Sequence, residues 1–211
     1  MKSSPFFLAL TAAFVVNLTA CSKPDAPAAP AKLNPAANPA ANPAANPVAS
    51  PSPAQSYEAA AAQGKGFSVG AIMSAHTVYV LFDPQCPHCG HLWEAAKPLQ
   101  SKAKFVWLPV SIMNAKSGPQ GAALLQAGNP AEAMSAHEKS ILAGTGGMTA
   151  SASAPAEIEQ SIKNNTALFN SLNANSVPYI MAKHAKTGQV VTHAGAMDTP
   201  ALAAWLGVDP P

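Results

Sequence analysis

Residues 77–89 read TVYVLFDPQCPHC, and this stretch predicts the centre of the fold. Its first six residues, Thr77–Phe82, form an unbroken run of β-branched, aromatic and aliphatic side chains, which is typical of a strand buried on both faces. A short turn follows. A helix can then begin at Cys86, because Pro87 occupies a first-turn position where its missing N–H costs little. The predicted buried stripe of this helix consists of Leu92, Trp93, Ala96 and Leu99.

Shorter patterns on both sides of this stretch predict the rest of an α/β domain. Tyr57–Ala62 should form a short helix at its start. The later predicted elements are a second buried strand at Phe105–Leu108, a helical insert at about 112–172, an antiparallel hairpin made by Pro178–Met181 and Gln189–Thr192, and a final helix capped by Thr199. This order predicts a central mixed sheet flanked by helices, built from residues 57–211.

Cys86 and Cys89 carry the chemistry that the sequence indicates. Two cysteines separated by two residues at a helix start can close a disulfide within one turn, with the first sulfur facing solvent and the second beneath it. Unpaired backbone N–H groups and the helix dipole stabilise a thiolate on Cys86 and lower its pKa. We therefore expect Cys86 to exchange with a substrate sulfur and Cys89 to resolve the mixed disulfide. His88 either places its imidazole near this thiolate or is a solvated loop residue.

Residues 82–89, followed by the Trp93 helix and later by Val177-Pro178, resemble the catalytic domain of the bacterial periplasmic disulfide isomerases, the DsbC/DsbG group. The likeness covers roughly residues 67–207. It implies a thioredoxin-like fold and a protein disulfide oxidoreductase that needs no cofactor. The Pro-His pair between the cysteines matches the related oxidase DsbA. In this superfamily the proline matching Pro178 is cis and lies beside the cysteines, and the residue matching Val177 makes a backbone contact with the substrate chain.

Three departures from the isomerase pattern affect what the resemblance implies. The isomerases carry an N-terminal dimerisation domain where this chain has a Pro/Ala/Asn segment, so we expect a monomer. They usually have Thr before the cis proline, and Val177 is closer to the oxidases. Thioredoxin and DsbA place a buried acid six residues before the first cysteine, where this chain has Val80. Proton transfer must then use water or another group, for which Asp83 and Glu94 are candidates. Oxidase, reductase and isomerase action all stay open.

The first 20 residues predict an export signal. Met1 and Lys2 supply a positive start, and Phe6–Val16 is an apolar run that is short for a membrane span. The following Leu-Thr-Ala-Cys21 resembles the lipobox of bacterial lipoproteins, which implies cleavage before Cys21 and its lipidation. Ser22 is not the Asp that retains such proteins at the inner membrane, so the resemblance implies a periplasmic domain anchored to the outer membrane. An ordinary secretory signal or an uncleaved anchor are the alternatives.

Residues 21–56 predict a disordered linker after the lipidated cysteine. The segment consists mostly of Pro, Ala, Asn and Ser, with Asn-Pro-Ala-Ala repeated three times from Asn34 to Ala45. Each Pro removes an N–H donor and disfavours helix in the residue before it. A semi-stiff spacer of this length reaches on the order of 100 Å when extended. It would let an anchored domain reach its partners over a wide volume.

Composition limits the partners. The formal charge is +2, and its 12 basic residues are all scattered lysines, so no basic stripe suits a phosphate backbone and no nucleic acid is expected. The expected partners are exported proteins with thiols or disulfides and a membrane redox protein that recycles the cysteine pair. The membrane itself is contacted through the lipid anchor only.

A metal-binding chaperone is the alternative function, because the same cysteines with His88 or His91 resemble part of a zinc or copper site. A fourth ligand is missing from the pattern, so no metal site is predicted. Covalent haem attachment would need His after Cys89, where the chain has Gly90. The sequence predicts His137 to be an ordinary surface histidine and Met113, Met134 and Met181 to fill the core.

Overall fold

The computed structural model describes residues 50–150 and 153–211. The predicted signal peptide over residues 1–20, the predicted lipidation of Cys21 and nearly all of the predicted linker over residues 21–56 lie outside these described residues. Within the described ranges, no helix combines the length and the apolar character needed to cross a bilayer.

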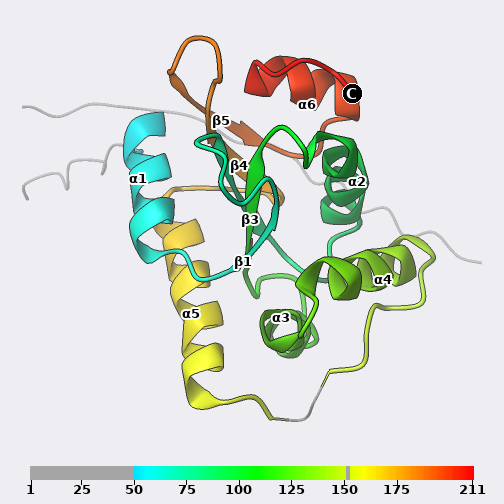
Figure 1. Ribbon diagram of the computed structural model, residues 1–211. Coiled ribbons are helices and arrows are strands. Elements are labelled where there is room, and N and C mark those ends of the chain that lie inside the picture. The colour runs from blue at the N-terminus through cyan, green and yellow to red at the C-terminus, as the bar shows by residue number, and fades with distance from the viewer. Residues whose placement is uncertain (1–49, 151–152) are drawn as a thin grey trace, which may run out of the picture. The chain divides into compact units, whose positions relative to one another are not determined.

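A five-stranded mixed sheet forms the centre of the domain, as the sequence predicts (Figure 1). Its spatial order is β1-β3-β2-β4-β5. The central strands β2 and β3 are parallel, whereas β1 on β3, β4 on β2 and β5 on β4 are antiparallel. The strands are β1 (Phe67–Gly70), β2 (Thr77–Phe82), β3 (Lys104–Pro109), β4 (Tyr179–Lys183) and β5 (Val190–Ala194).

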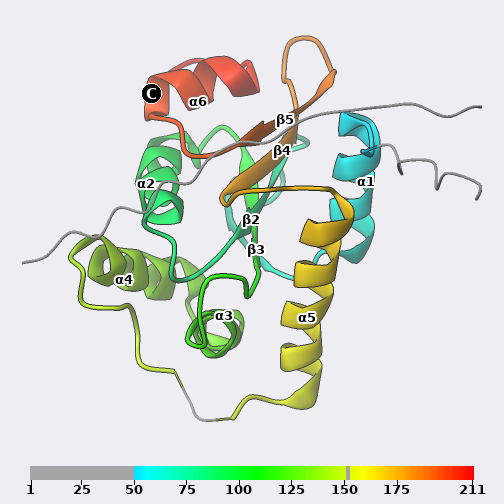
Figure 2. The ribbon, with the colours of Figure 1, turned by 180° about the vertical axis from the view of Figure 1, so that it is seen from behind.

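Helices cover both faces of this sheet, as Figures 1 and 2 show from opposite sides. One face carries α2 (Pro87–Ala96), α4 (Pro130–Leu142) and α6 (Thr199–Leu206). The other carries α1 (Pro53–Gln63) and α5 (Ala156–Ser171), and α3 (Ser117–Gln126) contacts both α4 and α5. A short 3-10 helix (Lys97–Leu99) continues from α2. Strand β2 confirms the prediction of burial on both faces, since Val80 and Phe82 lie in one core cluster and Leu81 in the other.

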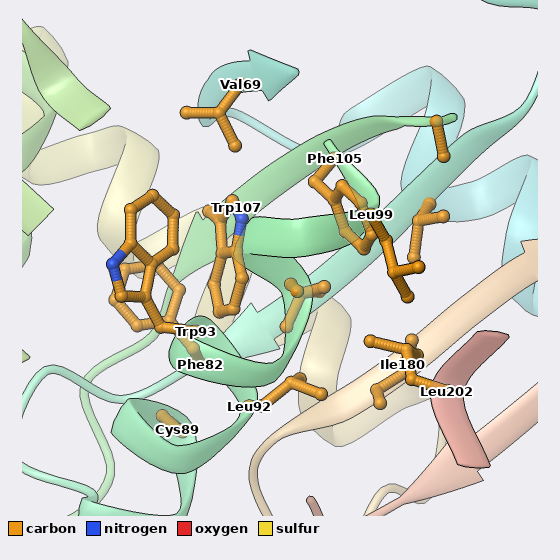
Figure 3. Packing of buried hydrophobic residues seen from close by; sticks show 14 of the residues in the cluster. Val69, Phe82, Cys89, Leu92, Trp93, Leu99, Phe105, Trp107, Ile180 and Leu202 are labelled. Atoms are coloured by element: carbon orange, nitrogen blue, oxygen red, sulfur yellow. The ribbon is translucent and has the colours of Figure 1, made fainter. Parts of the chain in front are cut away.

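A cluster of aromatic side chains forms the core beneath the cysteine-bearing helix α2 (Figure 3). Trp93 of α2 meets Trp107 of β3 edge to face, with ring centroids 5.1 Å apart, and Phe82 of β2 meets the same Trp107 at 5.5 Å. Edge-to-face pairs each contribute about 0.5–1.5 kcal/mol beyond the area they bury. This packing attaches α2 to the two central strands and so holds the start of the helix in place.

The helical insert confirms the prediction for about 112–172, since α3, α4 and α5 all lie within that range between β3 and β4. Asn129 caps α4, as its side chain accepts a hydrogen bond from the Glu132 N–H. Gly144 follows the end of α4 with a φ of +72°, a backbone conformation that suits glycine.

Two local predictions were wrong, and one strand was missed. Helix α1 starts at Pro53 rather than at the predicted Tyr57, because Ser52 and Gln55 form a capping box. Strand β1 was not predicted, because four residues at a sheet edge give too short a pattern. The last helix is capped by Asp198, whose carboxylate accepts from the Ala201 N–H, and Thr199 is already helical.

Candidate active site

Helix α2 begins with the two cysteines. Cys86 is its N-cap, with extended backbone angles, and Pro87 follows in the first turn as predicted. The Cys89 N–H donates to the Cys86 carbonyl over 3.0 Å, which closes the first turn and brings both residues to the same end of the helix. Both cysteines are free thiols. Cys89 is completely buried, whereas Cys86 is 4% exposed, so the prediction that Cys86 faces solvent openly was wrong.

The loop before β4 lies against the first sulfur. The Cys86 Sγ lies 3.5 Å from the Val177 carbonyl oxygen, although the two residues are far apart in the chain. The Val177–Pro178 peptide bond is cis, as the resemblance implied. Pro178 is buried and Val177 is half-buried. The structure therefore brings together four of the predicted site residues, Cys86, Cys89, Val177 and Pro178.

The pKa values of the two thiols are shifted in opposite directions. The pKa of Cys86 falls from 9.0 to about 6 because the Cys89 thiol hydrogen-bonds its sulfur; burial opposes this, and the backbone N–H groups of Cys89 and His88 and the His88 charge add to it. The pKa of Cys89 is raised, first by burial and then by its hydrogen bond to Cys86. At neutral pH the first sulfur is thus mostly an anion and the second keeps its proton. This difference is consistent with the predicted attacking role of Cys86.

His88 and Pro87 are exposed at the mouth of the site. The His88 ring lies 6.4 Å from the ring of His91, also exposed, one turn further along α2. His88 contributes to the acidity of Cys86 through both its backbone N–H and its side-chain charge, which supports the first of its two predicted roles. Substitution of the His88 side chain can remove the contribution of the imidazole charge, but it leaves the contribution of the backbone N–H.

Asp83 and Glu94, the two predicted candidates for proton transfer, are both engaged elsewhere. Asp83 is fully buried, and its carboxylate accepts from the backbone N–H groups of Gln85, Ile112 and Met113 over 2.9, 2.8 and 3.0 Å. It thereby ties the turn before Cys86 to the loop after β3. Glu94 is exposed and pairs with Lys97. Met113, predicted to fill the core, is 49% exposed, because only its backbone is held.

Helix α4 adds two buried residues that the sequence reasoning missed. His137, predicted to lie at the surface, is completely buried: its Nδ1 accepts from the Met148 N–H, and its Nε2 lies 2.6 Å from the Pro84 carbonyl. Glu138 is also completely buried. A signal existed for Glu138, since it occurs four residues after Met134 and three before Ile141, on the apolar stripe of the helix.

Across residues 50–150 and 153–211, no three or more His, Cys, Asp and Glu side chains gather closely enough to hold a metal ion.

Known proteins similar to this chain exchange disulfides. No protein-family model matches it. Thiol:disulfide interchange protein DsbG of Pseudomonas aeruginosa is 32% identical over 132 residues, which is 62% of this chain and 50% of that protein. DsbG of Escherichia coli is 30% identical over 118 residues, covering 54% and 47%. The chain thus resembles bacterial thiol:disulfide interchange proteins and spans about half their length.

Solved structures show the same fold. The catalytic domain of Proteus mirabilis ScsC superposes with a TM-score of 0.57 at 15% identity, covering 72% of this chain and 93% of that one. A periplasmic thioredoxin-like protein from Salmonella enterica serovar Typhimurium gives 0.54 at 14% identity, covering 67% and 87%. The fold of the described residues is therefore thioredoxin-like, with a mixed sheet between helical layers and a helical insert, as predicted.

Proposed function

We propose that this protein is a thiol-disulfide oxidoreductase that exchanges disulfides with exported proteins through Cys86 and Cys89. The observation that carries the proposal is the opposite acidity of two sulfurs joined by one helical turn, with the pKa of Cys86 at about 6 and that of Cys89 raised. The Cys86 sulfur is charged and nucleophilic, while the Cys89 sulfur keeps its proton. The likeness to the interchange protein DsbG supports the same chemistry.

The exchange proceeds in two displacements. The Cys86 thiolate attacks one sulfur of a substrate disulfide, forms a mixed disulfide, and the other substrate sulfur leaves as a thiolate. Cys89 then loses its proton and attacks the Cys86 sulfur; the Cys86–Cys89 disulfide forms, and the second substrate sulfur leaves. Two electrons have passed from the protein to the substrate. The reverse sequence oxidises a substrate dithiol and leaves both cysteines reduced.

Val177 supplies the contact for the substrate backbone in this proposal. Its carbonyl lies 3.5 Å from the Cys86 sulfur, so a peptide chain bound to that sulfur passes directly beside the Val177 backbone. Pro178 follows it and is buried, which holds this part of the loop against the domain. Pro87 and His88 are exposed in the first turn of α2, next to Cys86 in the chain, where a substrate bound to that sulfur can meet them.

The proposed setting is the periplasmic side of the outer membrane. Cys21 would carry the lipid anchor, residues 21–56 would form the tether, and a membrane redox partner would recycle the cysteine pair. A monomeric domain suffices, because both sulfurs and the Val177 loop come from a single chain. The Salmonella protein of the same fold is named as periplasmic, which supports this location.

Trapping of mixed disulfides tests the proposal. Cys89→Ala leaves the attacking thiolate but removes the resolving thiol, so it should accumulate disulfide-linked adducts with exported proteins, and reduction should release them. Cys86→Ala is the matched control and should form none. If adducts persist in Cys86→Ala and vanish in Cys89→Ala, the two roles are reversed. If neither variant forms adducts and the wild-type cysteines do not join under mild oxidant, disulfide exchange is refuted.

A further inference from the structure

Helix α4 places a carboxyl group without a hydrogen-bond partner against the active-site helix. Glu138 is completely buried, and neither of its carboxyl oxygens has a hydrogen-bond partner among the described residues. The carboxyl lies against Gly90, the residue after Cys89: a β-carbon built on Gly90 would lie 2.8 Å from Glu138 Oε2. Figure 1 shows α2 and α4 side by side, and Figure 2 agrees. A group buried in this way costs stability, which calls for a function.

The proposed exchange creates a need that this carboxyl can meet. Cys89 is completely buried and its pKa is raised, so its proton must leave before it can attack and must return when the disulfide opens. The two other acids considered for proton transfer already have partners. Asp83 already accepts three backbone hydrogen bonds, and Glu94 is exposed and paired with Lys97.

We propose that Glu138 is the proton acceptor and donor for Cys89. This inference rests on the proposed function. In the closing step Glu138 is ionised; the Cys89 S–H bond breaks, and its proton passes through one water molecule to a Glu138 oxygen, because neither oxygen is within hydrogen-bond distance of a side chain or backbone group of the described residues. The Cys89 sulfur attacks Cys86, the Cys86–Cys89 bond forms, and the substrate sulfur leaves with the electron pair of the broken mixed disulfide. In the opening step a substrate thiolate attacks Cys86, the Cys86–Cys89 bond breaks, and the departing Cys89 thiolate takes the proton back from Glu138.

The charges around Glu138 change during the reaction, and its protonation changes with them. Burial raises its pKa to about 9, and the Cys86 thiolate, Asp83 and Glu94 add to the rise. The charge of Glu138 in turn helps to raise the pKa of Cys89. In the resting reduced protein Glu138 therefore holds its proton. Once Cys86 is bonded to substrate, its negative charge is gone and the pKa of Glu138 falls. A larger fraction of the carboxyl then releases its proton to solvent, so an ionised carboxylate is present at the step that needs a proton acceptor.

Glu138→Gln tests the inference, with Glu132→Gln as the matched control. Gln keeps the size of the side chain and removes its proton exchange. Glu132 lies on the same helix and is exposed, and its backbone N–H still donates to the Asn129 side chain after substitution by Gln. Each reduced protein is mixed with excess oxidised glutathione, quenched with acid, and the mixed disulfide on Cys86 is followed by mass between about pH 6 and pH 9. The full chain or its exported form is used.

Glu138→Gln should accumulate the mixed disulfide and close it about 100-fold more slowly than wild type near pH 7, the lower end of what a positioned acid–base group contributes. Its closing rate should keep rising tenfold per pH unit, whereas the wild-type rate levels off once Glu138 is ionised. Gly90→Ala keeps the carboxyl but displaces it, and should give a smaller slowing. Glu132→Gln should match wild type.

The acidity of Cys86 distinguishes lost proton transfer from a distorted site. Alkylation of Cys86 should follow the same pH curve in Glu138→Gln as in wild type, because Glu138 is protonated where Cys86 titrates. Closing of Glu138→Gln at the wild-type rate with the wild-type pH profile would overturn the inference while leaving disulfide exchange intact. Failure of the wild type itself to form or close the mixed disulfide would overturn the proposed function.

Discussion

Replacement of Glu138 by Leu should stabilise the reduced protein, and increasingly so as the pH rises. The folded state raises the pKa of this carboxyl from 4.5 to about 9, so it keeps a proton that the unfolded chain releases. Because the folded state binds more protons, stability falls as the pH rises between these two values. Each pH unit costs about 1.4 kcal/mol, which amounts to about 3 kcal/mol at pH 7.

Leu also removes two buried oxygens that have no hydrogen-bond partner among the described residues. That gain is on the order of 1–3 kcal/mol and does not depend on pH. The stability difference between Glu138→Leu and wild type thus has two parts. The part that changes with pH reports the proton held by Glu138, and the constant part reports the burial of two polar atoms. The Cys86 thiolate is one cause of the raised pKa, so forming the Cys86–Cys89 disulfide should reduce the pH-dependent part.

Urea unfolding of the reduced wild type and of Glu138→Leu, at about pH 5 and about pH 8, measures the two parts. The difference between the two proteins should be larger at the higher pH by several kcal/mol, since about three pH units separate the measurements. Glu132→Gln serves as the control and should show the same small difference at both values. An advantage of Glu138→Leu that is equal at both pH values would refute the raised pKa. A loss of stability at both would refute the reasoning altogether.

Three further predictions concern the neighbours of the cysteines. Alkylation of Cys86 by iodoacetamide should reach half its maximal rate near pH 6, and His88→Ala should move this midpoint modestly upward, because the imidazole charge is a minor cause of the lowered pKa. Asp83→Ala leaves three backbone N–H groups without their acceptor and should lower the free energy of unfolding by about 3 kcal/mol or more in urea titrations, whereas Asp83→Asn should lose less. Burial lowers the pKa of His137 below 6.5, so at this residue the folded state binds fewer protons than the unfolded chain. The stability of the wild type relative to His137→Leu should therefore be lower at about pH 5 than at about pH 7, and urea unfolding of both proteins at the two values measures this difference.

Local patterns were sufficient for the elements that carry the cysteines. The run over residues 77–82 predicted β2 with its observed bounds, and Pro87 predicted the start of α2, because both depend on neighbours within a few residues. The predicted roles of Cys86 and Cys89 rest on the same local geometry. The cis bond before Pro178 came from the resemblance rather than from the pattern, and the structure confirms it.

Elements whose stability comes from distant parts of the chain were predicted less well. Strand β1 is four residues long and exists because β3 pairs with it across the sheet edge. The start of α1 was placed too late because the Ala-rich and Pro-rich composition before it hides the cap at Ser52. His137 was placed at the surface because a single histidine in a helix shows no sign of what will pack over it.

The amino-acid sequence by itself determined that two sulfurs lie together at a helix start and was sufficient to predict which of them attacks, because the spacing of a Cys-x-x-Cys pair and the dipole of its own helix are local properties. Only the tertiary structure decided what surrounds them. The Val177 carbonyl beside Cys86 and the Glu138 carboxyl beside Gly90 come from the loop before β4 and from the helical insert. Burial and charge act through space, so the acidity of these groups depends on contacts between segments that no local pattern records.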